Sequence, residues 1–500
     1  MCIYCDSGRM PGPEGSRRDF LKTSMLVGAA AAASGILAGS AHAQDAPAGT
    51  GIDGRRVLIK GGHVLSMDPA VGDFDQADVL INGKLIEAVG VNLDASGAEV
   101  IDATGMIVMP GFIDTHHHQF ETALRSFLAD GILVNDGVAA NAINYYDYIL
   151  QKFSMVYRPQ DVHINELFGS LAQLDAGVTT VMDVSQIHHS PEHSDAVIQA
   201  LKDAGRRAVF GYFEGWGDKA KYPMDATRLK TTHFASDDGL LSMVMGGEIY
   251  IPGYENAWKL GRELGLPIAL HVVGTFGMRP TFDQLAEAGQ FGPDNIFIHM
   301  TGMSEMAWKK AADAGAHVSL AVPIEMQMRH GMPPIQTALD LGMQPSLSSD
   351  VECTMTADPF TQMRGAMTLQ RALINEKALA GEKDLPALLT SRDVIRFATL
   401  EGARGLKLDK KCGSLTPGKE ADIVLLDATA INVTPLNHVP GAVVTLMERS
   451  NVDSVFVAGK LRKYKGKLLD VDIAKLRGEL EASRDFIFQA AGVPRDLFRA

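Results

Sequence analysis

Eight short apolar runs alternate with longer helical patterns between about residues 106 and 406. Strands that are each followed by a helix form parallel β/α units, because a parallel connection needs a long crossover. Eight such strands are enough to close a barrel, so the sequence predicts a (β/α)₈ barrel of the TIM type. In barrels of this type the chemistry lies at the carboxyl ends of the strands. The predicted strands are residues 106–113, 178–184, 207–213, 240–245, 267–273, 296–300, 316–321 and 345–349.

Both ends of the chain carry β-type runs separated by turn residues. Asn82-Gly83 stands between two of these runs, which is a strong hairpin signal. Similar runs return at residues 421–426 and 454–457. We therefore expect one small β-sandwich made from both ends of the chain. The predicted division is residues 44–109 and 407–470 for the sandwich, 110–406 for the barrel and 471–500 for a C-terminal helical segment.

The first 43 residues have the features of a twin-arginine export signal. Arg17-Arg18 precede an uncharged apolar run at residues 25–37, and Ala41-His42-Ala43 provides a cleavage site. The alternative is an uncleaved membrane anchor, for which the run is short and weakly hydrophobic. The signal predicts a periplasmic or otherwise exported protein that meets the twin-arginine machinery and keeps no membrane anchor after cleavage.

Charge and cysteine content narrow the function classes. The net charge of −14 argues against a nucleic-acid-binding protein, which needs a basic face to displace counterions from phosphate. Two of the four cysteines lie in the predicted leader, so Cys353 and Cys412 remain. Two cysteines do not form a disulfide framework, and the sequence leaves open whether they pair.

Metal-binding side chains fall at four separate ends of the predicted strands. His116 and His118 follow the first strand, His271 lies in the fifth, His299 in the sixth, and Asp350 directly follows the eighth. A single histidine at a strand end is usually structural, whereas this convergence favours a metal site. Imidazole and carboxylate ligands suit one divalent ion, with Zn²⁺ preferred and Fe²⁺ as the alternative.

The three consecutive histidines are expected to divide their roles. Residues i and i+2 of an extended segment point the same way. His116 and His118 can therefore bind one ion while His117 faces away.

Several other polar or aromatic residues are weaker candidates for the pocket. Three histidines after the second strand line the pocket mouth or belong to a solvated loop, and three tyrosines form an aromatic wall or ordinary helix surface and core. One residue beside the histidine motif and two after the seventh strand are expected to contact the substrate, with packing as the alternative for the latter segment. The histidines are His188, His189 and His193, and the tyrosines are Tyr145, Tyr146 and Tyr148. The residues expected to contact the substrate are Gln119, beside the histidine motif, and Glu325 and Gln327, after the seventh strand.

The segment Pro110-Gly111-Phe112-Ile113-Asp114-Thr115-His116-His117-His118 resembles the metal motif of the amidohydrolase superfamily, in its cytosine deaminase and chlorohydrolase-like branch. Residues 177–180 and 413–424 are similar to further landmarks of that branch, and the resemblance covers about residues 55–467.

This resemblance implies a barrel with a composite β-sandwich and one ion on His116, His118, His271 and Asp350, with His299 contacting the substrate. Superfamily members with two ions use a lysine at the end of the fourth strand to bridge them. Residues 240–247, which include the predicted fourth strand, contain no lysine, so one ion is favoured. Branch members are often dimers or larger, so a homo-oligomer is an expectation.

One departure from the branch bears on the reaction. Its deaminases carry a glutamate three residues after the fifth-strand histidine, where this chain has Gly274. We therefore expect hydrolysis of a non-peptide C–N bond in a small amide, urea or carbamate by metal-activated water. Asp350 would transfer the proton and His299 would stabilise the oxyanion. The alternatives are a deaminase or chlorohydrolase acting on an N-heterocycle, and a non-catalytic metal- or solute-binding protein of the cell envelope.

Overall fold

A computed structural model describes residues 46–498 of the chain. The expected export signal, residues 1–43, lies outside this range. From Pro47 onward the chain forms one compact unit that contains two sheets.

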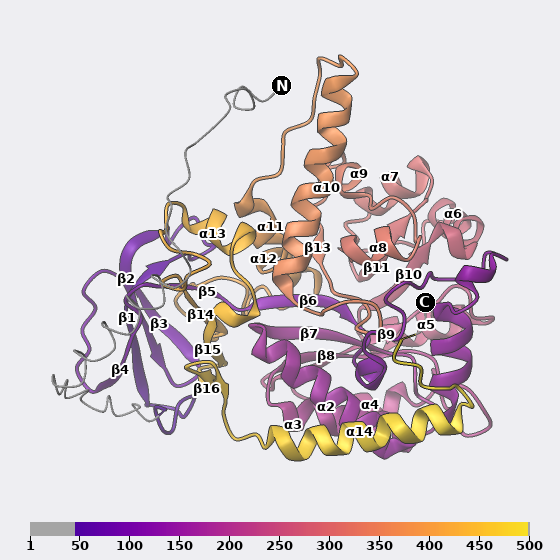
Figure 1. The fold of residues 1–500 in the computed structure, drawn as a ribbon, viewed down its shortest axis with the longest axis horizontal. Helices are drawn as coiled ribbons and strands as arrows, with labels where there is room; N and C mark the ends of the chain where they lie inside the picture. The colour runs from indigo at the N-terminus through magenta and orange to yellow at the C-terminus, as the bar shows by residue number, and fades with distance from the viewer. Residues whose placement is uncertain (1–45, 499–500) are drawn as a thin grey trace, which may run out of the picture. The chain divides into compact units, whose positions relative to one another are not determined.

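One of these sheets is the predicted barrel. Its eight strands follow one another in chain order and pair in parallel. Figure 1 shows the strands at the centre of the unit with helices around them. The strands are β6 (Phe112–His117), β7 (Val178–Ser185), β8 (Arg207–Tyr212), β9 (Leu241–Gly246), β10 (Ile268–Val273), β11 (Asn295–Thr301), β12 (His317–Leu320) and β13 (Ser346–Leu347).

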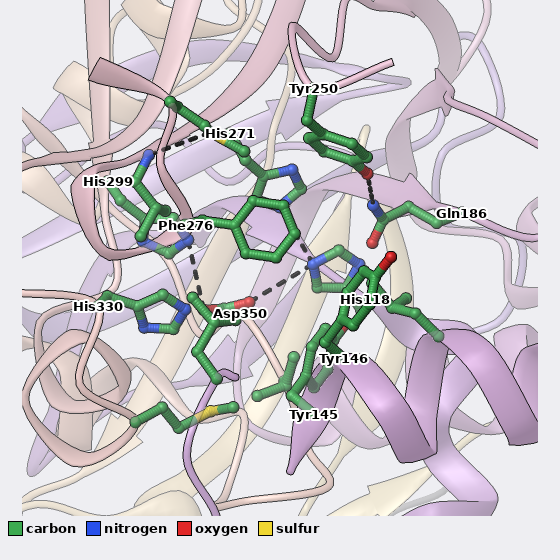
Figure 2. Close-up of a pocket in the computed structure, with 16 residues that line it drawn as sticks. His118, Tyr145, Tyr146, Gln186, Tyr250, His271, Phe276, His299, His330 and Asp350 are labelled. Carbon is green, nitrogen blue, oxygen red and sulfur yellow. Dashed lines mark hydrogen bonds and ion pairs between the residues drawn. The ribbon is translucent and has the colours of Figure 1, made fainter. Parts of the chain in front are cut away.

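The residue that closes the barrel is Asp350. It follows β13 and forms a parallel bridge with His117 at the end of β6. The backbone N–H of Asp350 donates to the carbonyl of His116 at 3.0 Å, and His118 N–H donates to the carbonyl of Asp350 at 2.9 Å. Closure therefore brings the last strand beside the histidine motif, and the Asp350 carboxylate faces His118 and His299 (Figure 2).

Helices connect the strands, and local sequence fixes their ends. α3 begins after Ser190 with Pro191 in its first turn, where proline's missing N–H is not needed. It ends at Gly205, whose φ of 64° is the left-handed conformation that glycine adopts readily. The helices of the barrel region are α2 (Pro159–Asp175), α3 (Pro191–Ala204), α4 (Ala226–His233), α5 (Tyr254–Glu263), α6 (Arg279–Glu287), α7 (Glu305–Asp313), α8 (Val322–Gln327), α9 (Ile335–Asp340), α10 (Pro359–Leu379), α11 (Ser391–Phe397) and α12 (Leu400–Gly405).

The second sheet is built from both ends of the described chain, as predicted. β5 pairs with β14 in an antiparallel register, and this seam joins N-terminal to C-terminal strands within one nine-stranded sheet. The Asn82-Gly83 hairpin between β2 and β3 is confirmed. The strands are β1 (Arg56–Val64), β2 (Phe74–Asn82), β3 (Leu85–Gly90), β4 (Ala98–Asp102), β5 (Met106–Pro110), β14 (Ile423–Asp427), β15 (Val452–Val457), β16 (Lys460–Tyr464) and β17 (Lys467–Leu468).

The prediction of one strand over residues 106–113 was wrong, because the chain changes sheets within it. Gly111 N–H donates to the carbonyl of Asp422 beside β14, whereas Phe112 N–H donates to the carbonyl of Gly177 beside β7. A Cβ atom on Gly111 would lie 2.2 Å from the Thr179 side chain, so only glycine fits this crossing point. The segment is therefore β5 of the composite sheet followed by β6 of the barrel.

Two contacts connect other parts of the chain to the barrel. Arg207 on β8 donates to Asp422 at 2.8 Å and to Glu420 at 2.6 Å, and these side chains are buried. The C-terminal helix α14 (Ile473–Ala490) lies along α2, where Ser483 donates to Asp161 at 2.8 Å (Figure 1). A short helix α13 (Val439–Thr445) precedes β15.

Within residues 46–498, no helix is long and apolar enough to cross a membrane.

Candidate metal centre and active site

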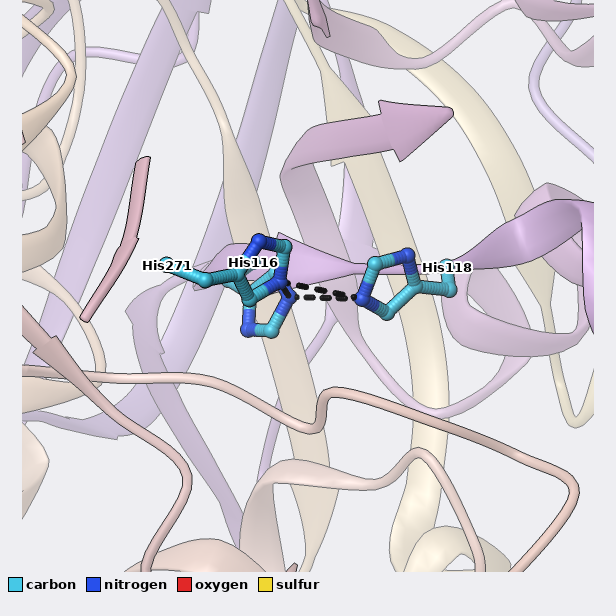
Figure 3. A group of neighbouring side chains, drawn as sticks. All are labelled: His116, His118 and His271. Carbon is cyan, nitrogen blue, oxygen red and sulfur yellow. Dashed lines mark hydrogen bonds between the residues drawn. The ribbon is translucent and has the colours of Figure 1, made fainter. Parts of the chain in front are cut away.

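Three histidines from two barrel strands direct their Nε2 atoms at one point. His116 Nε2 lies 2.9 Å from His118 Nε2 and 3.0 Å from His271 Nε2, and the latter two are 3.3 Å apart (Figure 3). Three nitrogen ligands at about 2.0–2.1 Å from a tetrahedral zinc ion would be separated by roughly 3.3 Å. The observed triangle is close to that size, so these side chains fit a divalent ion.

Hydrogen bonds on the outer side of two rings fix the tautomers that metal binding needs. His118 Nδ1–H donates to the carbonyl of Val184 at 2.8 Å, and His271 Nδ1–H donates to Glu248 at 2.5 Å. A proton on Nδ1 leaves the lone pair of Nε2 free toward the centre of the triangle. Burial lowers the pKa values of His116 and His118 well below the ordinary range, which keeps both rings neutral.

The Asp350 carboxylate extends this site. Its Oδ1 lies 3.6 Å from His116 Nε2 and 3.5 Å from His118 Nε2. Asp350 has a φ of 61°, an uncommon backbone conformation for a non-glycine residue, which the bridge to His117 holds in place. Burial raises the pKa of Asp350 to about 7. The positive charge of a bound ion would favour the carboxylate instead.

His299 occupies the opposite side of Asp350. Its Nε2 lies 3.6 Å from Asp350 Oδ2, while its Nδ1 contacts Glu325 at 3.0 Å. His330 stacks on the ring of His299, with centroids 4.7 Å apart. Two overlapping groups of side chains are therefore spaced for a metal ion: His116, His118 and His271, and His116, His299 and Asp350.

A largely apolar pocket opens above these residues. It reaches His118, His271, His299 and Asp350 (Figure 2). Arginine and lysine are absent from its lining, as far as residues 46–498 show. The wall residues are Leu133, Tyr145, Tyr146, Leu150, Gln186, Tyr250, Val273, Phe276, Met278, Met328, His330 and Val351.

Aromatic rings form one side of this pocket. Phe276 stands between Tyr146 and Tyr250, with ring centroids 5.6 and 5.4 Å away. Tyr145 also lines the pocket, and its hydroxyl donates to the buried Glu121 at 2.6 Å. Of the three predicted tyrosines, Tyr148 packs on Phe127 instead. Flat rings and aliphatic side chains favour an uncharged substrate with an aromatic or apolar portion.

The His117 ring lies apart from the rings of His116 and His118, as the alternation of side chains predicts. His117 turns away from the triangle, and its Nδ1–H donates to the carbonyl of Asp350 at 2.8 Å. His117 therefore supports the bridge that carries Asp350.

Three residues expected at the substrate lie elsewhere. Gln119 points into a buried network, where its amide donates to Glu166 and Asp183 at 3.0 and 3.1 Å. Glu325 lies behind His299 and accepts from the backbone N–H of Ala321 at 2.9 Å. Gln327 is exposed and donates to the carbonyl of Ala129. None of the three lines the pocket in the described part of the chain, because short helices at 119–124 and 322–327 turn their side chains aside.

The histidines after β7 also have structural partners. His188 contacts Ser194 at 2.9 Å, His189 donates to the carbonyl of Ser154, and His193 donates to the carbonyl of Tyr157, both at 3.0 Å. They are buried or half-buried, so the solvated loop that we expected is not observed.

A side chain at position 274, where the glutamate is expected, would be crowded by neighbouring backbone. A Cβ atom there would lie 3.0 Å from the Thr301 carbonyl oxygen and 3.1 Å from Gly302 Cα. Those atoms belong to the backbone, which cannot rotate away as a side chain can. Among residues 46–498, Asp350 is the one carboxylate in the pocket lining.

Four polar residues of the site were not predicted. Glu248 holds His271, His330 stacks on His299, and Gln186 and Tyr250 line the pocket. All four lie outside the regular strands, in segments whose conformation no local pattern fixes. Glu248, Gln186 and Tyr250 come shortly after barrel strands, where pocket residues gather, and this position is the signal that could have found them; His330 instead follows α8.

The two cysteines of the described chain are both unpaired. Cys353 and Cys412 are buried, and no disulfide joins them.

Comparisons with known proteins identify the family and agree with the fold. The sequence profile described as "Amidohydrolase family" matches residues 107–462. A 5'-deoxyadenosine deaminase from Methanosarcina mazei is 25% identical, covering 86% of this chain and 98% of its own. A 5-methylthioadenosine/S-adenosylhomocysteine deaminase from Pyrococcus furiosus is 26% identical over 84% of this chain and 98% of its own.

Two solved structures with zinc share the fold. An adenosine deaminase from Xanthomonas campestris has a TM-score of 0.73 at 23% identity, covering 88% of this chain and all of its own. An atrazine chlorohydrolase from Arthrobacter aurescens has a TM-score of 0.75 at 21% identity, covering 86% of this chain and all of its own.

Proposed function

Because the chain belongs to the amidohydrolase family, we propose that it hydrolyses the C–N bond of an uncharged amide, urea or carbamate. The observation that carries this choice is the single carboxylate, Asp350, in the pocket lining of the described chain. Removing ammonia from an aromatic ring requires protons at a ring nitrogen and at the departing amine. A carbonyl substrate needs only one proton moved from water to the leaving nitrogen.

We further propose that the ion is zinc and that His116, His118, His271 and Asp350 hold it. The support is the imidazole-rich donor set, the spacing of the three Nε2 atoms and the zinc in related structures. When bound, such an ion supplies Lewis acidity toward a carbonyl and makes water more acidic.

The proposed proton transfer uses Asp350. Its carboxylate accepts a proton from the attacking water and returns it to the leaving nitrogen. His299 stabilises the developing oxyanion through a proton on Nε2. Glu325 contacts Nδ1 of His299 and allows Nε2 to carry this proton. A protonated Glu325 does so by donating to Nδ1 of the neutral ring, and an ionised Glu325 does so by stabilising the imidazolium.

The test compares two substrate classes on the zinc-loaded protein. We expect amine or ammonia release from members of a panel of benzamide, phenylurea and methyl phenylcarbamate, and little ammonia from cytosine, guanine or aminotriazines. Gly274→Glu should not improve the preferred reaction, because its side chain would meet the backbone of Thr301 and Gly302. Rapid deamination of a heterocycle, with no activity on any carbonyl substrate, would contradict the proposal.

A second candidate is deamination or dechlorination of an N-heterocycle. The names of the related proteins favour it, and the aromatic wall of Tyr146, Phe276 and Tyr250 could stack on a flat ring. The same panel distinguishes this candidate from the first. Membership in a hydrolase family argues against the non-catalytic binding protein.

Residues 1–43 are proposed to direct export through the twin-arginine pathway to the periplasm or beyond. The support is the order of the arginine pair, the uncharged apolar run and the Ala41-His42-Ala43 cleavage site.

A further inference from the structure

The wall of the pocket carries one polar group that the proposed chemistry does not use. Gln186 follows β7 and is buried, yet its side chain lines the pocket. Two residues earlier, Val184 accepts the hydrogen bond from His118. The Gln186 amide is therefore anchored on the same strand end that orients a histidine of the proposed metal site.

Hydrogen bonds fix the direction of this amide. The Nε2 group of Gln186 donates to Glu214 Oε1 at 2.9 Å and to the Tyr250 hydroxyl at 3.0 Å. Tyr250 in turn donates its own proton to Glu214 Oε1. Rotating the amide by half a turn would place its oxygen against a carboxylate oxygen and lose both donations.

The amide oxygen is left facing the pocket. Figure 2 shows it turned away from Tyr250 and toward His118. It accepts no hydrogen bond from any residue between 46 and 498, while the surrounding wall is mainly apolar. An acceptor that lines a mainly apolar pocket and has no donor among these residues can receive an N–H group of a bound ligand in place of water.

We propose that Gln186 determines specificity, because its amide oxygen accepts a hydrogen bond from an N–H group of the substrate. This inference rests on the proposed function and narrows its substrate class. The preferred substrates are uncharged primary or secondary amides and ureas with an aromatic or apolar portion, and fully N-alkylated compounds are disfavoured. Glu214 and Tyr250 act as positioning residues, since they orient the amide.

Calorimetry on the zinc-loaded protein tests the proposal with benzamide and N,N-dimethylbenzamide, which differ in the N–H group. Every protein compared, the wild type included, carries Asp350→Asn, so that benzamide is bound without being hydrolysed. The ratio of their dissociation constants in the wild type is compared with the ratio in Gln186→Met, which keeps the side-chain length. Loss of one hydrogen bond should reduce the preference for benzamide roughly fivefold to tenfold. Comparing ratios cancels the difference in size between the two ligands.

Two further variants make the result specific. Gln362→Met is the matched control, because Gln362 is a buried glutamine on α10 whose amide atoms have no hydrogen-bond partner within the described residues. It should keep the wild-type ratio. Glu214→Gln releases the orientation of the Gln186 amide and should give an intermediate ratio, which also tests the proposal if Gln186→Met does not fold.

Each outcome decides a separate point. Equal binding of the two amides by the wild type, no binding of either, or an unchanged ratio in Gln186→Met would overturn the role of Gln186. A Gln186-dependent preference without hydrolysis of any carbonyl substrate would leave the recognition site standing and contradict the proposed function.

Discussion

Glu248 is expected to control the zinc affinity of the site without binding the ion. Its carboxylate lies 2.5 Å from His271 Nδ1 and also accepts from the backbone N–H of that residue at 3.3 Å. Glu248 is fully buried, so water cannot replace the contact in a variant. The change to test is Glu248→Gln, which keeps the shape of the side chain and removes its charge.

The size of the effect follows from this one contact. A hydrogen bond to a charged group contributes about 1.5–3 kcal/mol, which corresponds to roughly tenfold to a hundredfold in zinc affinity. The glutamine oxygen can still accept from Nδ1–H, so we expect a loss of about tenfold. Glu248→Leu leaves Nδ1–H without an acceptor, and its loss should approach about a hundredfold.

Competition with a chromophoric chelator at constant pH measures this affinity. Glu121→Gln is the matched control, because Glu121 is also a buried glutamate but holds Tyr145 rather than a histidine. Its zinc affinity should stay close to that of the wild type. Equal affinity for Glu248→Gln and the wild type would refute the claim that Glu248 orients a zinc ligand.

Three further predictions concern the histidine motif, export and pH. By elemental analysis, His116→Ala should abolish zinc binding, whereas His117→Ala should retain about one ion per chain, since only the His116 ring faces the site. Equal loss of zinc from both variants would contradict these separate roles. Replacing Arg17 and Arg18 by lysine should keep the protein in the cytoplasm with its leader, as fractionation would show, and unchanged export would remove the assignment. Burial raises the pKa of Glu121 from 4.5 to about 8. The folded state therefore holds this proton more tightly than the unfolded state, and the free energy of unfolding falls as the pH rises between these two values. Urea unfolding should therefore show Glu121→Gln gaining stability over wild type from pH 5 to pH 8, by at most about 5 kcal/mol, and a constant difference would refute the shift.

The barrel and the histidine triangle could be predicted because both depend on regular patterns. Strand spacing established the parallel units, and the alternation of side chains placed His116 and His118 on one side. Asp350 was predicted from its place after the eighth strand. The structure adds that its backbone bridge to His117 closes the barrel.

The pocket wall could not be predicted in the same way. Gln119 and Glu325 were expected at the substrate, but short helices begin at these segments and turn both side chains into buried contacts. Gln186 and Tyr250 come from separate loops, and each contacts the other and Glu214. Such contacts depend on tertiary packing, which local patterns do not encode.

We expect this site to hydrolyse a carbonyl C–N bond only when it holds a metal ion. The most direct test is a zinc titration of chelator-treated protein while amine or ammonia release from the best carbonyl substrate is followed. We expect hydrolysis to rise linearly and to level off at about one ion per chain, with no rise in an Asp350→Asn variant. Full turnover in the metal-free protein, or zinc-restored activity on aminated heterocycles alone, would contradict metal-dependent hydrolysis of a carbonyl substrate.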